Sequence, residues 1–168
     1  MNAELLILRL VHILGGMFWI GTAVFMSFYL IPAAAEAGAA GGQVMANLAK
    51  RKLMVVLPIV AILTILSGAR LMQKAAGFAP GYFKTGSGHT YAISAILAVV
   101  ALIIGITVSR PAHLKAASLS QSSVSDQTSK EMIQAEIRTL HKRATMASNI
   151  VTVLVILAAA GMAIARYM

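Results

Sequence analysis

Residues 91–109 have the sequence YAISAILAVVALIIGITVS, which contains no charged side chain. A helix of about 20 mainly apolar residues crosses a hydrocarbon core of about 30 Å, so this stretch is long enough to span a bilayer. Three more segments are similarly long and apolar, at residues 10–31, 53–71 and 145–165, and Arg70 near the end of the second is their single charged residue. Because backbone polar groups in lipid must be satisfied internally, these segments predict an all-α, integral membrane four-helix bundle.

The composition of the whole chain agrees with this prediction. Of the 168 residues, 59% are hydrophobic and 11% are charged, and the mean hydropathy is +0.83. Soluble domains are about half apolar and about a quarter charged, so this chain lacks the polar side chains that cover a soluble surface. The formal net charge is +9, but the basic residues flank the apolar segments. We therefore expect the lipid bilayer, and not a nucleic acid, to be the partner of this charge.

The basic residues also predict an orientation. Four spans place both termini on one side and the connections 32–52 and 110–144 on the other. Because Lys and Arg are enriched in cytoplasmic loops, we expect periplasmic termini in a bacterial inner membrane. The two connections hold the larger group of basic residues: Lys50, Arg51, Lys52, Arg110, Lys115, Lys130, Arg138, Lys142 and Arg143. The side of the termini holds Arg9, Arg70, Lys74, Lys84 and Arg166.

Helices are expected to extend beyond the membrane on the cytoplasmic side. Thr128 and Glu131 have the spacing of a capping box, and apolar residues at helical spacing continue from there into the fourth span. This pattern predicts one helix of about 40 residues, which is about 60 Å long. We expect the first span to end at Pro32 and the third at Arg110-Pro111. The chain is then a single transmembrane domain over residues 1–168, with 110–144 in the cytoplasm.

Polar residues inside the spans are the first candidates for a functional site, because exposing them to lipid is costly. His12 shares one helical face with Arg9, Gly15, Gly16 and Trp19. The two glycines allow another helix or a flat ligand to approach the backbone closely. The alternative is that His12 only donates a hydrogen bond to a neighbouring helix.

His89 comes directly before the third span, on the same side of the membrane as His12. Two imidazoles on neighbouring helices suit axial ligation of a b-type haem, and they also suit part of a copper site. Arg9 and Arg70, at the level of the lipid head groups, can pair with haem propionates. The alternative is that His89 only caps the third span at the interface.

A second, weaker pair of candidate ligands, His113 and His141, flanks the cytoplasmic connection. They suit a second cofactor, or they are ordinary polar residues of the interface. Because the chain has no cysteine, histidine is the main candidate ligand for any metal. The fourth span continues with polar residues that are typical of hydrogen bonds between helices: Thr145, Ser148, Asn149 and Thr152.

The first span also carries a family resemblance. The order Leu10-x-His12, Trp19-x-Gly21 and a closing Ile-Pro pair at Pro32 resembles a group of small bacterial four-span membrane proteins. The group includes the copper-resistance protein D-like domains and the HemJ-type protoporphyrinogen oxidases. The HemJ-type members imply a b-type haem with the first-helix His as axial ligand, here His12, and a Lys on a later helix; the third span has no internal Lys. The copper-resistance members imply copper handling on the periplasmic side.

Three functional hypotheses follow from these patterns. The favoured one is a membrane-bound b-type haem protein that passes electrons between a quinone and a periplasmic partner, which would make it a membrane oxidoreductase. The second is a copper-binding or copper-transport protein, and imidazole suits both metals. The third is a non-catalytic structural or accessory membrane subunit, or a homo-oligomer, in which the histidines only support the fold.

Overall fold

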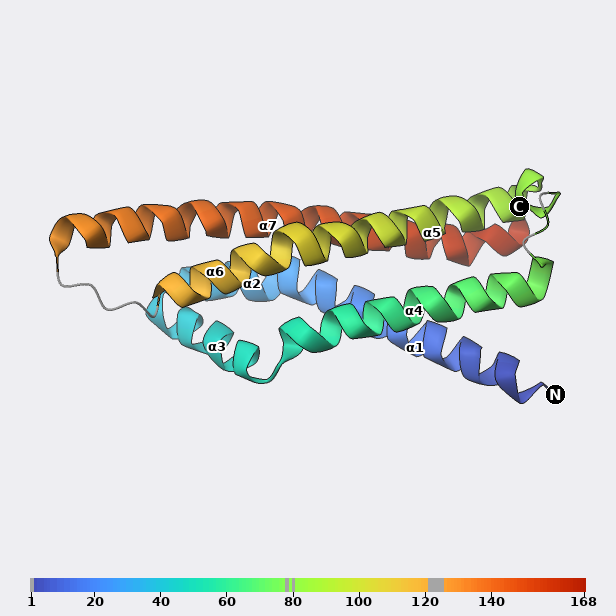
Figure 1. Ribbon diagram of the computed structural model, residues 1–168, viewed down its shortest axis with the longest axis horizontal. Coiled ribbons are helices and arrows are strands. Elements are labelled where there is room, and N and C mark those ends of the chain that lie inside the picture. The colour runs from blue at the N-terminus through green and yellow to red at the C-terminus, as the bar shows by residue number, and fades with distance from the viewer. Residues whose placement is uncertain (1, 78, 80, 121–125) are drawn as a thin grey trace.

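The computed structural model describes residues 2–77, 79, 81–120 and 126–168, and these residues are almost entirely helical (Figure 1). Four helices are long and apolar enough to cross a membrane, which confirms the predicted all-α four-helix membrane bundle. These four helices cover Ala3–Glu36, Leu53–Ala76, Gly86–Ser120 and Gln127–Tyr167. Each extends beyond the apolar segment from which it was predicted.

The first half of the chain forms a helical hairpin. Its first arm consists of α1 (Ala3–Phe25), the π-helical segment η1 (Met26–Leu30) and α2 (Ile31–Glu36). The second arm consists of α3 (Ala39–Lys50) and α4 (Leu53–Ala76). The backbone of Lys52 is left-handed, with φ of 60°, and this turn separates α3 from α4.

The second half forms another hairpin. After the short helix η2 (Tyr82–Lys84), its first arm consists of α5 (Gly86–Ile104), the π-helical segment η3 (Gly105–Ser109) and α6 (Arg110–Ser120). The other arm is α7, and the short helix η4 closes the chain. These two elements cover Gln127–Ile164 and Ala165–Tyr167.

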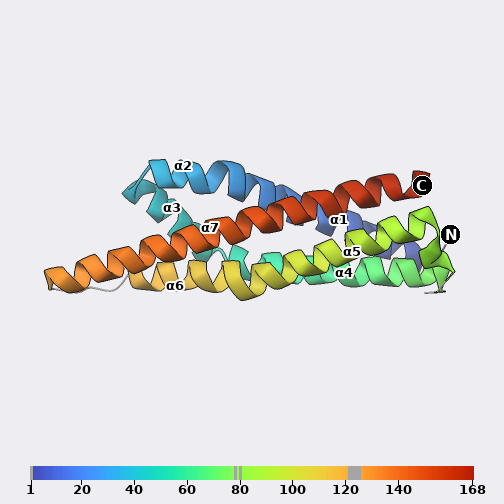
Figure 2. The same ribbon diagram turned by 90° about the horizontal axis from the view of Figure 1, so that it is seen from above.

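The two hairpins lie against each other and form the bundle. Helix α1 packs along α4, and α5 packs along α7, while α1 with α7 and α4 with α5 form the smaller contacts between hairpins. Both chain termini lie at the same end of the molecule, and the long connections lie toward the other end (Figures 1 and 2). This arrangement is the one expected for four spans.

Small residues allow the arms of each hairpin to approach closely. A Cβ atom at Gly15 would overlap Thr64 Oγ1 of α4, and a Cβ atom at Gly161 would overlap Ser94 Oγ of α5. Gly15 and Ser94 each lie 17 residues before the proline of their span. The two hairpins therefore repeat one arrangement, in which a close contact is followed by a π-helical segment and a proline.

Pro32 and Pro111, in the first arms of the two hairpins, lie inside continuous helices. Pro32 and Pro111 each come two residues after a π-helical segment, in which Ile31 N–H donates to Met26 O and Arg110 N–H donates to Gly105 O. Proline lacks an N–H and disturbs the i→i−4 ladder, and a π turn has already shifted the ladder by one residue. The helices therefore continue past both prolines, and the end of each membrane span at its proline stays a prediction.

The start of α7 also differs from the prediction. Asp126 is the N-cap, and its carboxylate accepts a hydrogen bond from the backbone N–H of Ser129 at 3.0 Å. This hydrogen bond holds the pKa of the exposed Asp126 carboxyl below its usual value. The capping box predicted at Thr128 and Glu131 is wrong, because Asp126 already satisfies the free backbone donor. The single long helix is confirmed, since α7 has 38 residues.

A buried hydrogen bond joins the two hairpins near the middle of the bundle. Ser27 Oγ of η1 and Thr152 Oγ1 of α7 are 2.8 Å apart, and the exposed fractions of these residues are 5% and 0%. Thr152 Oγ1 also lies 3.2 Å from the carbonyl oxygen of Ala23. Two of the polar residues predicted to bind between helices, Ser148 and Thr152, do so, whereas Asn149 is exposed.

We expect Thr152→Val to lower the free energy of unfolding by about 1 kcal/mol, because it removes the bond between hairpins and leaves the buried Ser27 hydroxyl without this partner. Unfolding in mixed detergent micelles, followed by circular dichroism, measures the change. Thr139→Val is the matched control on the same helix, since Thr139 is exposed and bonds only the Ala135 carbonyl of its own helix. Equal stability losses in the two variants would contradict the prediction.

Candidate functional site

His12 is held against α4 by a hydrogen bond to the backbone. Its Nδ1 atom lies 2.8 Å from the carbonyl oxygen of Thr64, and the side chain is half-buried. A carbonyl oxygen only accepts hydrogen bonds, so Nδ1 carries the proton and donates. In the neutral ring the proton is then absent from Nε2, which is left as an acceptor or a metal ligand.

Helix α4 has a glycine where the imidazole ring lies. A Cβ atom at Gly68 would be 2.6 Å from His12 Cε1, so a larger residue there would displace the ring. Ser67 Oγ donates to the same Thr64 carbonyl at 3.0 Å, and it also donates to Leu63 O at 2.7 Å. The position of His12 is thus set by the backbone and small residues of α4.

Thr64, Ser67 and Gly68 were not predicted from the sequence as partners of His12. A usable signal was present, because Thr64, Ser67 and Gly68 are small or polar residues inside an otherwise apolar span. Such residues are enriched where transmembrane helices approach each other. Sequence alone, however, does not tell which of the other three spans faces His12.

His89 lies apart from this hydrogen bond. It is exposed in the first turn of α5, where its backbone N–H donates to Thr85 O. Helix α5 packs on α7, whereas His12 belongs to the α1–α4 pair. The structure places His89 at the end of the bundle that carries the termini, since neighbouring Ser87 bonds the carbonyl oxygen of Met168. His12 therefore forms its hydrogen bond with α4, and His89 takes no part in that hydrogen bond.

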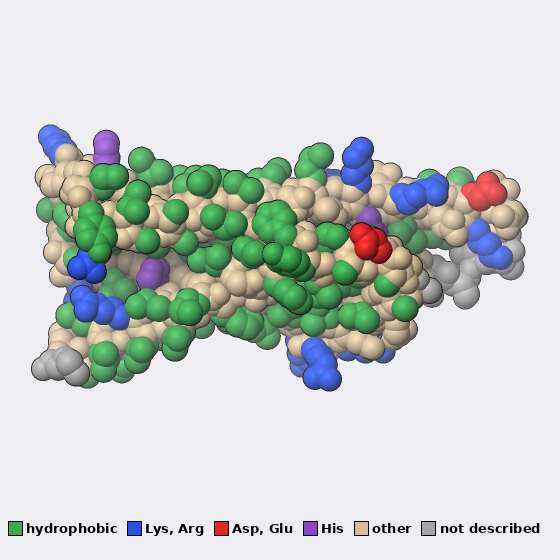
Figure 3. Space-filling view, turned by 180° about the vertical axis from the view of Figure 1, so that it is seen from behind, with side chains coloured by type: hydrophobic (Ala, Val, Ile, Leu, Met, Phe, Trp, Pro, Cys, Tyr) green, Lys and Arg blue, Asp and Glu red, His purple; other side chains and the backbone are tan. Residues whose placement is uncertain are grey.

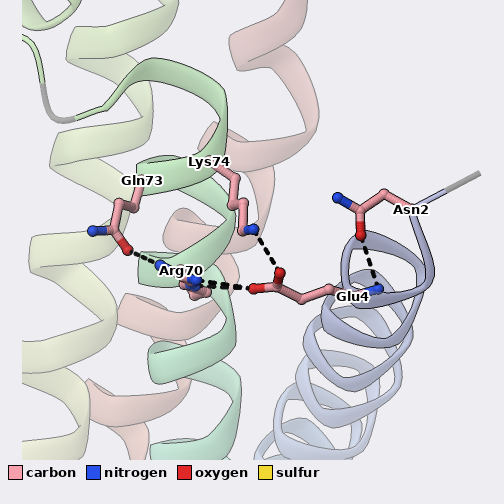
Figure 4. Close-up of polar contacts among 5 residues, drawn as sticks. All are labelled: Asn2, Glu4, Arg70, Gln73 and Lys74. Atoms are coloured by element: carbon pink, nitrogen blue, oxygen red, sulfur yellow. Dashed lines mark hydrogen bonds and ion pairs between the residues drawn. The ribbon is translucent and has the colours of Figure 1, made fainter.

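The basic residues predicted to bind an acidic group lie at the same end. Arg70 Nη2 and Lys74 Nζ contact the two carboxylate oxygens of Glu4, at 3.1 and 2.5 Å, and Arg70 also bonds Gln73 (Figure 4). Two cations share one carboxylate here, so the cluster keeps a net positive charge. Arg9 is exposed. Figure 3 shows a histidine side chain in a hollow at this end of the molecule, beside basic side chains.

The remaining residues predicted beside His12 belong to the packed interior. Gly15 and Gly16 both approach Thr64, with a Cβ at Gly16 lying 3.8 Å from Thr64 Cγ2. The glycines thus admit α4 to the face of α1. Trp19 has an exposed fraction of 5% and belongs to the apolar core, farther along α1.

The second candidate pair is divided between the interior and the surface. His113 of α6 is half-buried, with Nε2 3.5 Å from Ser148 Oγ, whereas His141 of α7 is exposed. His113 lines a half-open cavity of about 120 Å³, whose wall includes residues of α1, η1, α4, α5, η3, α6 and α7. Within the described part of the chain, no group of three or more His, Asp or Glu side chains can hold a metal ion.

In comparisons with protein-family models, with curated proteins and with solved structures, no match to this chain was found.

We expect neutral His12 to be protonated at Nδ1, because only that tautomer donates to the Thr64 carbonyl. ¹⁵N NMR of the histidine side chains at about pH 8 distinguishes the two tautomers. His89 is the internal control, since an exposed imidazole averages between both. A His12 ring protonated at Nε2 would contradict the hydrogen bond.

Proposed function

We propose that this multi-pass membrane protein binds a b-type haem with His12 as an axial ligand. The observation that carries the proposal is the hydrogen bond from His12 Nδ1 to the Thr64 carbonyl. A ligating histidine usually donates its other ring nitrogen to a carbonyl or carboxylate, which fixes the tautomer and makes the ligating nitrogen more basic. His12 has this arrangement, with Nδ1 donating to the Thr64 carbonyl and Nε2 available as the ligand.

Two further features support the fit of a haem to these residues. Gly68 makes room for the imidazole on α4, since a Cβ there would overlap the ring. The cluster of Glu4 with Arg70 and Lys74 has an excess positive charge, which suits a carboxylate such as a propionate. A bound haem supplies one-electron redox chemistry. The residues of this chain would then orient it, balance its charge and exclude lipid.

The proposal assigns His89 as the second ligand, with a separate test from that of His12. His89 is exposed and lies on α5, outside the α1–α4 pair, at the end of the bundle that carries the termini. A quinone and a periplasmic protein are the proposed electron partners. Haem is favoured over copper because one or two imidazoles suffice for it, while no cluster of three His, Asp or Glu residues lies in the described chain.

We expect the purified protein, supplied with haem, to show a Soret band that shifts on reduction, and His12→Ala to lose most of it. Gly68→Ala should weaken haem binding about 10- to 100-fold, because it disturbs the orientation of the ligand rather than the ligand itself. His141→Ala is the matched control, since His141 is exposed on α7, a helix that carries neither His12 nor His89. Absorption spectra of the oxidised and reduced forms are the measurement.

Three outcomes separate the hypotheses. A full Soret band in His12→Ala would overturn the assignment of His12. A normal band in His89→Ala would remove His89 alone and leave His12 as the protein ligand. A wild-type protein that binds neither haem nor copper, and in which His12→Ala only lowers stability, would favour the structural or accessory subunit.

We also propose a bacterial inner-membrane location with periplasmic termini. The support is the larger number of basic residues on the two long connections. Alkaline phosphatase fused after Met168 should be active, because the enzyme folds only in the oxidising periplasm. The same fusion inserted after Ser120 should be inactive, and the reverse pattern would invert the topology.

A further inference from the structure

A second candidate binding site is a half-open cavity of about 120 Å³ between the two hairpins, which is distinct from the His12 site. His12 and His89 do not line it. Its wall comes from both hairpins, and both π-helical segments contribute to it. Residues of these segments that line the cavity are Met26, Ser27, Gly105, Ile106 and Ser109. π-Helical turns within α-helices occur frequently at functional sites.

The cavity has one polar end with a cation that lacks an anionic partner. Arg110 lines it, and its Nε atom is buried without a hydrogen-bond partner among the described residues. No Asp or Glu lines the cavity. In the described part of the chain, the ion pairs are those of Glu4 with Arg70 and Lys74, and of Lys115 with Glu136. An anionic group is therefore the chemical complement of this end.

Neutral polar groups line the same cavity as Arg110. Ser148 Oγ is 2.8 Å from Ser109 Oγ and 3.5 Å from His113 Nε2, and all three residues line the cavity. The 3.5 Å contact is at the long limit of a hydrogen bond, so these groups retain capacity for a further acceptor. Two oxygens of a carboxylate can accept bonds from a guanidinium and from such neighbours together.

The remainder of the wall is mainly apolar. Trp19 lies on α1 and Leu57 on α4, and Val151 completes this side from α7. Empty apolar cavities of about 150 Å³ hold molecules of the size of benzene, so the cavity can admit a few carbon atoms of a single chain.

We infer that this cavity binds a single-chain amphiphile with an ionised carboxylate head group, such as a fatty acid. The carboxylate lies at Arg110, with Ser148 and His113 beside it, and the first part of the chain lies toward Trp19. Apolar contact and a charge-assisted hydrogen bond then act on one molecule. The inference is independent of the haem proposal, because the two sites share no ligand residue.

Trp19 provides the measurement, because it is the single tryptophan of the chain and it lines the cavity. The protein is placed in nanodiscs of neutral phosphatidylcholine and titrated with 4,5-dibromooctanoate, whose bromine atoms lie in the first half of the chain and quench tryptophan at short range. We expect saturable quenching by the acid and only weak, unsaturated quenching by its methyl ester. Arg110→Gln should raise the apparent Kd for the acid at least 10-fold.

Lys115→Gln is the matched control, since Lys115 lies on the same helix but is exposed and does not line the cavity. It should leave the Kd of the acid unchanged. Equal quenching by acid and ester, or an unchanged Kd in a folded Arg110→Gln variant, would overturn the inference. Loss of the acid's quenching in nanodiscs that contain phosphatidylglycerol would mean that an anionic lipid head group is the occupant, and would also overturn it.

Discussion

The close contact between the arms of each hairpin is the constraint on which the rest of the structure depends. Gly15 meets Thr64, and Ser94 meets Gly161, with no space for a further carbon atom. Lipid is as apolar as the helix surfaces, so helices associate in a membrane through such tight packing and through hydrogen bonds between them. The same contact brings the α4 backbone to within reach of His12. The close approach of α1 and α4 therefore produces both the packing of this hairpin and the candidate site at His12.

The π-helical segments follow from a second constraint, which is the proline in the first arm of each hairpin. A proline inside an ordinary helix removes a backbone bond and clashes with the preceding turn. The shift of the ladder before Pro32 and Pro111 allows both helices to continue, as α2 and α6. Ser27, which contacts Thr152, lies in the first shifted segment, and Arg110, which lines the half-open cavity, directly follows the second. The π-helical segments thus allow the helices to continue and also contribute residues to the cavity wall.

The two candidate sites differ in what holds them in place. His12 is positioned by a backbone carbonyl and a glycine of α4, which leaves one ring nitrogen available. Arg110 forms no ion pair with a carboxylate of the described chain, and its Nε atom has no hydrogen-bond partner there. A preorganised imidazole suits a cofactor that stays bound. A cation without an anionic partner suits a ligand that brings the opposite charge.

The sequence by itself determined the four apolar helices, their order and the candidate residue His12. These follow from length, hydropathy and the cost of a polar group in lipid, which are properties of each segment alone. It also predicted the long final helix, but it did not predict the helix ends beyond Pro32 and Pro111, and it placed the N-cap of the final helix at Thr128 instead of Asp126. Those ends depend on backbone hydrogen bonds that residue type does not specify.

Only the tertiary structure decided which helices are partners. It paired α1 with α4, assigned the Thr64 carbonyl to His12, left His89 on the surface and formed the cavity at Arg110. All four spans are apolar around most of their circumference, so hydropathy does not distinguish one neighbour from another. The small residues and the π-helical segments do distinguish them, because they set which helices can pack closely together.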